Sequence, residues 1–270
     1  MSKISTIAAM IDSYTNTAIK NYVKSHDEST YFPKEMWDEL TNEMDIFLPI
    51  LSEENHTLSS DFITFIRKIA NEFAALSAIL LTQGCYGIYS ILNFGTAEQK
   101  ELYLEKLLKG QYIGGLGFCE YKHLKGLEDL ETYATKTEQG WCLSGKKAMI
   151  SNSSVADILL VLAKVKEQGK VEKYGLFIVD PKDSDVLIGE QIEKPGLIGL
   201  PLSSVTLKNV LLPENALLGD ELAGDVQFAN IIKNMQLGLS AIALGVAEGA
   251  FNKGIEFAKV RRGFGKRLID

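Results

Sequence analysis

Two runs of strand-forming residues lie in the middle of this sequence, between long stretches of helical composition. Residues 158–165 and 174–180 are rich in leucine, β-branched and aromatic residues and are bounded by Gly, Asp or Pro, which is typical of buried strands. Residues 132–144 predict a hairpin with a turn at Glu138-Gln-Gly. Because no long helical segment separates these strands, the pattern favours a small antiparallel barrel or sandwich over a parallel sheet.

The flanking stretches predict helices. Thr96 and Gln99 have the spacing of a capping box, which begins a helix that Gly110 ends. Residues 73–82 are small and apolar, as in a buried helix. Residues 228–262 have helical composition throughout, with glycines and alanines that permit close helix packing.

The predicted fold class is therefore α+β and multidomain. We expect an N-terminal helical domain over residues 1–113, a central antiparallel β barrel or sandwich over 114–215, and the start of an incomplete C-terminal helical bundle over 216–270.

Composition excludes several functions. The 28 basic and 35 acidic side chains give a net charge of −7, which argues against nucleic-acid binding, because that usually needs a basic face. The N-terminus lacks the apolar run of a signal peptide, and the most apolar region, 237–258, contains Glu248, Asn252, Lys253 and Glu256. We therefore expect no membrane span.

The cysteines point to a reducing compartment. The three cysteines and three histidines show no metal-ligand spacing, so no metal site is expected. An odd and sparse cysteine count fits a cytoplasmic protein.

Five phrases in order, spanning residues 93–266, resemble the acyl-CoA dehydrogenase family of flavoproteins. Gly145-Lys-Lys-Ala-Met-Ile-Ser-Asn is similar to the family's Gly-x-Lys-x-Trp-Ile-Thr-Asn strand, and Ala258-Lys-Val-Arg-Arg-Gly-Phe-Gly-Lys to its Ala-x-x-Arg-x-x-Phe-Gly-Lys. The other three phrases lie at 93–110, 114–120 and 210–219.

The resemblance implies a FAD-dependent oxidoreductase of fatty acid metabolism. Such an enzyme oxidises an acyl thioester, carried by CoA or a carrier protein, at its α and β carbons. A carboxylate removes the α proton while the flavin accepts a hydride. Donors must also stabilise the developing oxyanion of the thioester.

The resemblance also implies cofactor-binding residues. The backbone around Phe118 and Cys119 would bond the pyrimidine end of the flavin, and Ser151 stands where a Thr hydroxyl serves the N5 side. Met149 stands where the family stacks a Trp. The alternative roles are ordinary: a small buried hydrophobe for Cys119, core packing for Phe118 and Met149, and a turn start for Ser151.

Two positions near the end of the sequence imply an oligomer. Arg261 and Phe264 match residues that contact the FAD of a neighbouring subunit, which implies a homodimer or homotetramer. The alternative is that Arg261 belongs to a solvated basic helix end.

The stretch after Glu120 departs from the family pattern. Lys125 stands at the position of a Ser that holds the FAD pyrophosphate, and Lys122 replaces a glycine. Lys122, His123 and Lys125 could instead supply charge to a phosphate or phosphopantetheine group. A solvated loop is the slightly preferred alternative.

No catalytic base is identified. Met235 and Gln236 occupy one family position of the base and its neighbouring Arg, and the other position lies further along the family's C-terminal domain than Asp270. The sequence thus leaves three hypotheses: an acyl-thioester dehydrogenase or a fragment of one with the base missing, a non-catalytic binding or assembly protein, and an oxidase or monooxygenase.

Overall fold

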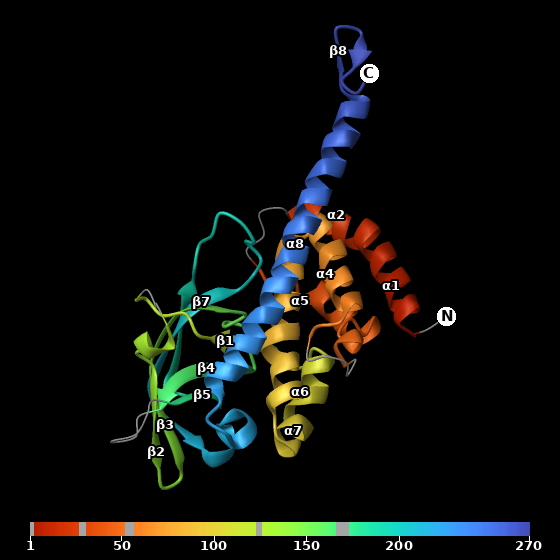
Figure 1. Ribbon diagram of the computed structural model, residues 1–270. Coiled ribbons are helices and arrows are strands. Elements are labelled where there is room, and N and C mark those ends of the chain that lie inside the picture. Colours follow the sequence, from red (N-terminus) through yellow and green to blue (C-terminus); the bar gives the residue numbers. More distant parts are fainter. Residues whose placement is uncertain (1–2, 27–30, 52–56, 123–125, 166–172) are drawn as a thin grey trace.

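A computed structural model describes residues 3–26, 31–51, 57–122, 126–165 and 173–270. Helices, a curled sheet and a long final helix follow one another along the chain (Figure 1). The predicted fold class is confirmed.

The N-terminal helices pack around one apolar core. The capping box of the last helix is formed as predicted, since the Thr96 hydroxyl accepts from the Gln99 N–H at 3.2 Å and the Gln99 side chain accepts from the Thr96 N–H at 3.0 Å. The helices are α1 (Lys3–Tyr14), α2 (Lys20–His26), α3 (Lys34–Asp38), α4 (Ser60–Glu72), α5 (Ala74–Thr82), α6 (Ser90–Phe94) and α7 (Ala97–Leu108).

Helices α5 and α6 are joined by a π-helical segment, Gln83–Tyr89, into one helix over Ala74–Phe94. The helix Ala74–Phe94 is long and apolar enough to cross a membrane, but 94% of its most apolar 18-residue stretch is buried inside the protein. By composition, residues 237–258 had been predicted to be the most apolar region. The hydropathy of Ala74–Phe94 follows from its place in the helical core.

A seven-stranded sheet has the order β1-β4-β2-β3-β7-β6, and the seventh strand, β5, pairs with β4 outside this order. The predicted hairpin is formed by β2 and β3. Four pairings are antiparallel, as expected, but β4 pairs in parallel with β1 and β2. The strands are β1 (Gly114–Gly117), β2 (Tyr133–Thr137), β3 (Gly140–Ser151), β4 (Ile158–Val165), β5 (Lys173–Val179), β6 (Val186–Gln191) and β7 (Leu202–Pro213).

Strand β4 contributes to two hydrophobic cores. Leu160 and Leu162 pack in the core shared with the N-terminal helices, whereas Leu159 and Val161 pack inside the curled sheet. Successive side chains of a strand point to opposite faces, so β4 separates the two cores.

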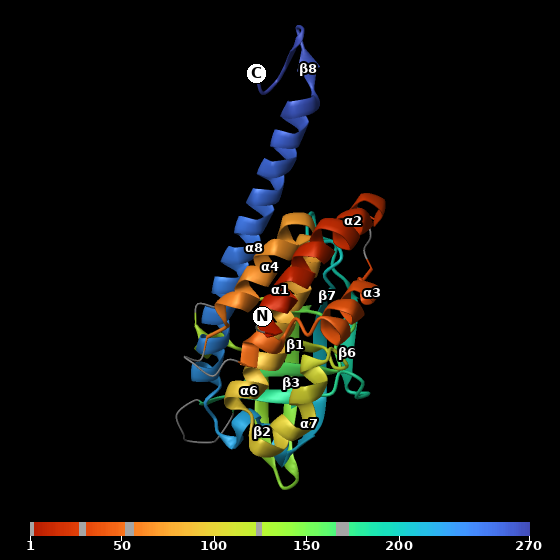
Figure 2. The same cartoon turned by 90° about the vertical axis from the view of Figure 1, so that its right-hand side faces the viewer.

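The final helix, α8 (Gly224–Val260), packs closely against α4, as its small residues predicted. A Cβ atom at Gly245 would lie 2.2 Å from the Arg67 carbonyl oxygen, and one at Gly249 would lie 2.1 Å from that of Asn71. Beyond this contact the helix projects past the other helices and ends in a small hairpin, β8 (Arg262–Gly263) and β9 (Lys266–Arg267) (Figures 1 and 2).

Candidate functional site

The candidate site begins where β1 ends. Gly117 is the last residue of β1 paired with β4, so the next residues, Phe118, Cys119 and Glu120, leave that ladder. The Cys119 carbonyl accepts a hydrogen bond from the Ala148 N–H at 2.8 Å. This bond holds the segment beside β3.

A cavity of about 570 Å³ opens beside this segment, and we call it the β1-end cavity. Phe118, Cys119 and Met149, which were predicted to share a site, all line it. Its volume and largely apolar wall are those of small-molecule and cofactor pockets, which range over about 300–1,000 Å³. Among the described residues, the lining is Phe118, Cys119, Glu120, Tyr121, Lys122, Gly126, Leu127, Leu130, Met149, Leu162 and Phe228.

Phe228 brings α8 to this cavity. Its ring centroid lies 5.1 Å from that of Phe118, with the ring planes tilted by 49°. Such aromatic pairs add to the apolar burial at a contact. Sequence reasoning missed Phe228, because no local pattern shows where α8 crosses the end of β1.

Glu120, which lines the cavity, forms a buried ion pair with Lys147. The Lys147 Nζ lies 2.7 Å from Glu120 Oε1, with side-chain exposures of 0% and 2%. The carboxylate also accepts from the backbone N–H of Glu131 at 2.7 Å and of Thr132 at 3.1 Å. Both oxygens of the Glu120 carboxylate are therefore bonded to groups of the protein itself.

Electrostatics in this cluster favour an ionised carboxylate. Burial raises the pKa of Glu120, but the bond and charge of Lys147 and the other hydrogen bonds together hold the pKa below its usual value. Burial lowers the pKa of Lys147 to about 8, although Glu120 opposes that shift. Burial also raises the pKa of the Cys119 thiol, which Lys147 partly offsets, so Cys119 is a neutral thiol near pH 7.

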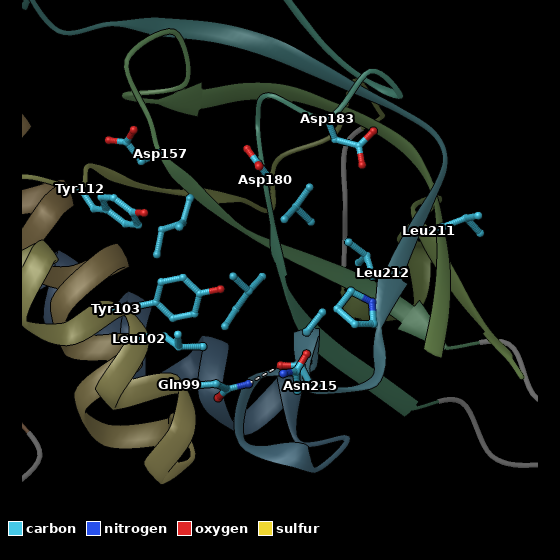
Figure 3. Close-up of a pocket in the computed structure, with 15 residues that line it drawn as sticks. Gln99, Leu102, Tyr103, Tyr112, Asp157, Asp180, Asp183, Leu211, Leu212 and Asn215 are labelled. Atoms are coloured by element: carbon cyan, nitrogen blue, oxygen red, sulfur yellow. Dashed lines mark hydrogen bonds between the residues drawn. The ribbon is translucent and has the colours of Figure 1, made fainter. Parts of the chain in front are cut away.

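A second cavity of about 350 Å³ lies between α7 and the sheet, and none of the predicted site residues that the structure describes lines it (Figure 3). The Tyr103 hydroxyl points into it from α7, and Asp157, Asp180 and Asp183 lie toward one end. Asp157 is already engaged, accepting from the Ile113 N–H at 3.1 Å and from Lys182 at 3.0 Å. Within the described residues, no three His, Cys, Asp or Glu side chains are grouped closely enough to hold a metal ion.

Comparison with known sequences identifies the family. The sequence model of the acyl-CoA dehydrogenase N-terminal domain matches residues 3–111, and that of the acyl-CoA dehydrogenase middle domain matches residues 115–210. The chain belongs to the acyl-CoA dehydrogenase family. The two matches together cover most of the chain and meet where β1 begins.

Individual acyl-CoA dehydrogenases support this assignment. An acyl-CoA dehydrogenase of Bacillus subtilis (strain 168) is 32% identical over 209 residues, which are 77% of this chain and 55% of that protein. The chain thus spans little more than half the length of this relative. The solved butyryl-CoA dehydrogenase of Megasphaera elsdenii superposes with a TM-score of 0.89 at 25% identity, over 100% of this chain and 72% of that one.

A third match shares the fold. Glutaryl-CoA dehydrogenase of Mycobacterium smegmatis, solved in complex with FADH2, gives a TM-score of 0.85 at 24% identity. It covers 99% of this chain and 68% of that chain.

Ser151 and Lys125 are also predicted from family resemblance to contact the cofactor. Ser151 pairs with Leu202 at the end of β3 and does not line the cavity. Lys125 lies outside the described residues. The cofactor roles predicted for both residues remain predictions.

Arg261 and Phe264 stand at the opposite end of α8 from Phe228. Both are exposed, Arg261 just after the helix and Phe264 in the β8–β9 turn. A helix of 37 residues is roughly 55 Å long at about 1.5 Å per residue. These two residues therefore cannot share a ligand with the β1-end cavity of the same chain.

The family positions for a base hold no available carboxylate in the described part of the chain. Met235 is 8% exposed and packs in the core shared with the N-terminal helices, while Gln236 is exposed. Among the described residues that line the β1-end cavity, Glu120 is the one with a carboxylate, and its oxygens are already bonded.

Proposed function

We propose that this chain binds FAD in the β1-end cavity and serves the FAD-dependent α,β-dehydrogenation of acyl thioesters. The observation that carries the proposal is the cavity itself, bordered by Phe118, Cys119 and Met149 where family resemblance predicted the flavin. Family membership supports FAD as the cofactor and acyl-CoA dehydrogenation as the general reaction.

The residues of the cavity suit such a group. The main chain at Phe118 and Cys119 offers polar atoms, while Met149, Phe118 and Phe228 supply apolar and polarizable surface. When bound, FAD supplies the acceptor for a hydride. The chain's own residues bind and orient it, and the neutral Cys119 thiol adds no charge beside it.

We place the substrate among acyl thioesters of CoA or of a carrier protein, in fatty acid metabolism in the cytoplasm. The chain works as a homodimer or homotetramer, supported by the exposed Arg261 and Phe264 at the end of α8. The base comes from outside the described residues or from a partner.

A FAD titration tests the proposal. Purified protein is expected to quench FAD fluorescence on binding and to give a protein-bound flavin spectrum. Met149→Asp places a negative charge on the cavity wall and is expected to weaken FAD binding by at least about tenfold, since an unpaired charge is costly next to a buried anionic ligand. Leu187→Asp is the control, because Leu187 is similarly exposed on β6 but lines no part of this cavity. Wild-type protein that leaves FAD free would refute the proposal.

A second candidate is a non-catalytic protein of the same fold that binds an acyl ligand or a partner. The commitment of Glu120 to Lys147 and the burial of Met235 favour it. Adding acyl-CoA thioesters to the FAD-loaded chain under anaerobic conditions separates the two candidates. Bleaching of the flavin would establish dehydrogenation by this chain, whereas an unchanged spectrum with bound FAD supports the second candidate.

A further inference from the structure

The Glu120 carboxylate joins three segments of the β domain. It accepts from the N–H groups of Glu131 and Thr132 at 2.7 and 3.1 Å, and from Lys147 on β3 at 2.7 Å. Glu120 and Glu131 flank a segment of which the structure describes residues 121–122 and 126–130, and we call these described residues the 121–130 loop. One side chain therefore ties both ends of this loop to each other and to β3, and we call this arrangement the Glu120 clasp.

The clasp supports two walls of the β1-end cavity. Phe118 and Cys119, directly before Glu120, form one wall. Described residues of the tied loop form another, namely Tyr121, Lys122, Gly126, Leu127 and Leu130. A shift of the carboxylate would move both walls together.

Stability alone does not account for a pair buried this deeply. Lys147 and Glu120 are 0% and 2% exposed, and removing two charges from water is costly. Replacing such pairs by apolar groups of similar volume is often neutral or stabilising. Positioning is a different benefit, because a loop held in its binding geometry loses less conformational entropy when a ligand arrives.

We infer that Glu120 and Lys147 are positioning residues, which hold the 121–130 loop and the Phe118–Cys119 wall in the geometry that receives the cofactor. Their role rests on the proposed function of the cavity. Glu120 acts through the backbone it fixes and not as a base toward substrate.

The test uses the double variant Glu120→Gln/Lys147→Met, which removes both charges while nearly conserving volume. Glu120→Gln alone would leave a buried lysine unpaired and invite misfolding. We expect the double variant to keep a thermal midpoint close to that of wild type. We also expect faster amide hydrogen exchange at residues 120–132 in the FAD-free protein, and FAD binding weaker by about tenfold or more.

Asp157→Asn/Lys182→Met is the matched control. This ion pair, 3.0 Å apart, also involves the sheet-containing part of the chain, but its Asp157 lines the cavity of Figure 3 instead. We expect wild-type FAD affinity and wild-type exchange at residues 120–132 in this control.

Two readouts separate the inference from the proposed function. If the double variant folds and shows wild-type exchange at residues 120–132, the clasp does not position the loop and the inference fails. If exchange rises but FAD binds both proteins equally, the role toward the cofactor is overturned. If wild type binds no FAD, the proposed function fails, and the exchange data still decide whether the clasp orders the loop.

Discussion

The four partners at the Glu120 clasp are two backbone N–H groups, a lysine ammonium and the carboxylate that joins them. Phe118, Cys119 and Met149 each fall within a short phrase typical of one family, and all three line one cavity. Their roles toward a cofactor remain predictions. Phe228 could not be predicted, because it follows Phe118 by more than a hundred residues and meets it only through the packing of α8. The clasp was also missed, since its N–H donors carry no side-chain pattern.

The clasp makes folding stability depend on pH in two windows. The folded pKa of Glu120 is below its ordinary 4.5, so its contribution is present above that value and is lost as the pH falls through the folded pKa. The folded pKa of Lys147 is about 8, against 10.5 ordinarily. The unfolded chain therefore binds more protons between these values, and stability rises with pH there.

We accordingly expect wild type to gain stability relative to Glu120→Gln/Lys147→Met as the pH rises through each window. Urea unfolding at a series of pH values measures this difference. A difference that stays constant from acid to alkaline pH would show that neither group titrates differently on folding.

Helix α7 could be predicted from local sequence, because the two residues of its capping box, Thr96 and Gln99, lie within one turn of helix. The β2–β3 hairpin could also be predicted, because its turn and the two paired strands are adjacent in the sequence. The parallel pairing of β4 with β1 and β2 was not predicted. The residue pattern of a strand indicates that it is a strand, but it does not indicate which strand pairs with it. Gln99 shows a similar limit, since its helix cap was predicted and its long-range bonds were not.

Gln99 couples α7 to the segment that leaves the sheet. Its amide nitrogen donates to the Asn215 and Leu217 carbonyls at 2.8 Å each, and its oxygen accepts from the Gly219 N–H at 3.1 Å. Gln99→Leu is expected to destabilise the protein by more than about 2 kcal/mol, because buried backbone groups lose their partners. Thr96→Ala, which removes only the hydroxyl of the cap, is expected to cost about 1 kcal/mol. Equal losses in chemical denaturation would contradict the coupling.

The seam between α4 and α8 depends on glycine. A Cβ at Gly245 would lie 2.2 Å from a backbone oxygen of α4, whereas one at Gly254, further along the same helix, would have nothing within 4 Å. Gly245→Ala is expected to destabilise by about 1–3 kcal/mol, because the helices must separate. Gly254→Ala is expected to stabilise by up to about 1 kcal/mol through helix propensity. Thermal unfolding of the pair measures both, and a stabilising Gly245→Ala would refute the close seam.

At the largest scale, the molecule carries apolar side chains on the part of α8 that projects beyond the other helices. Phe251, Phe257 and Val260 are 69%, 58% and 76% exposed. Exposed apolar groups in this number are typical of association surfaces, and they adjoin the hairpin that holds Phe264. This placement agrees with the proposed homo-oligomer.

We expect light scattering to show a dimer or tetramer, and Phe257→Ser to weaken that assembly. Leu211→Ser, on β7 and 71% exposed, removes a comparable apolar side chain away from α8 and is expected to leave the mass unchanged. A monomeric wild-type protein would contradict the proposed assembly.

Because alternate side chains of β4 pack in two different cores, this one strand belongs to both the helical core and the core of the sheet. A gene trimmed to residues 114–215 would expose Leu160 and Leu162 to water, together with Leu116, Leu176 and Ile178 from neighbouring strands. Such a truncated product is expected to aggregate, since the sheet would have lost the helices that cover one of its faces. Substitutions at Leu160 or Leu162 should therefore be accompanied by compensating changes in the helical residues of the same core.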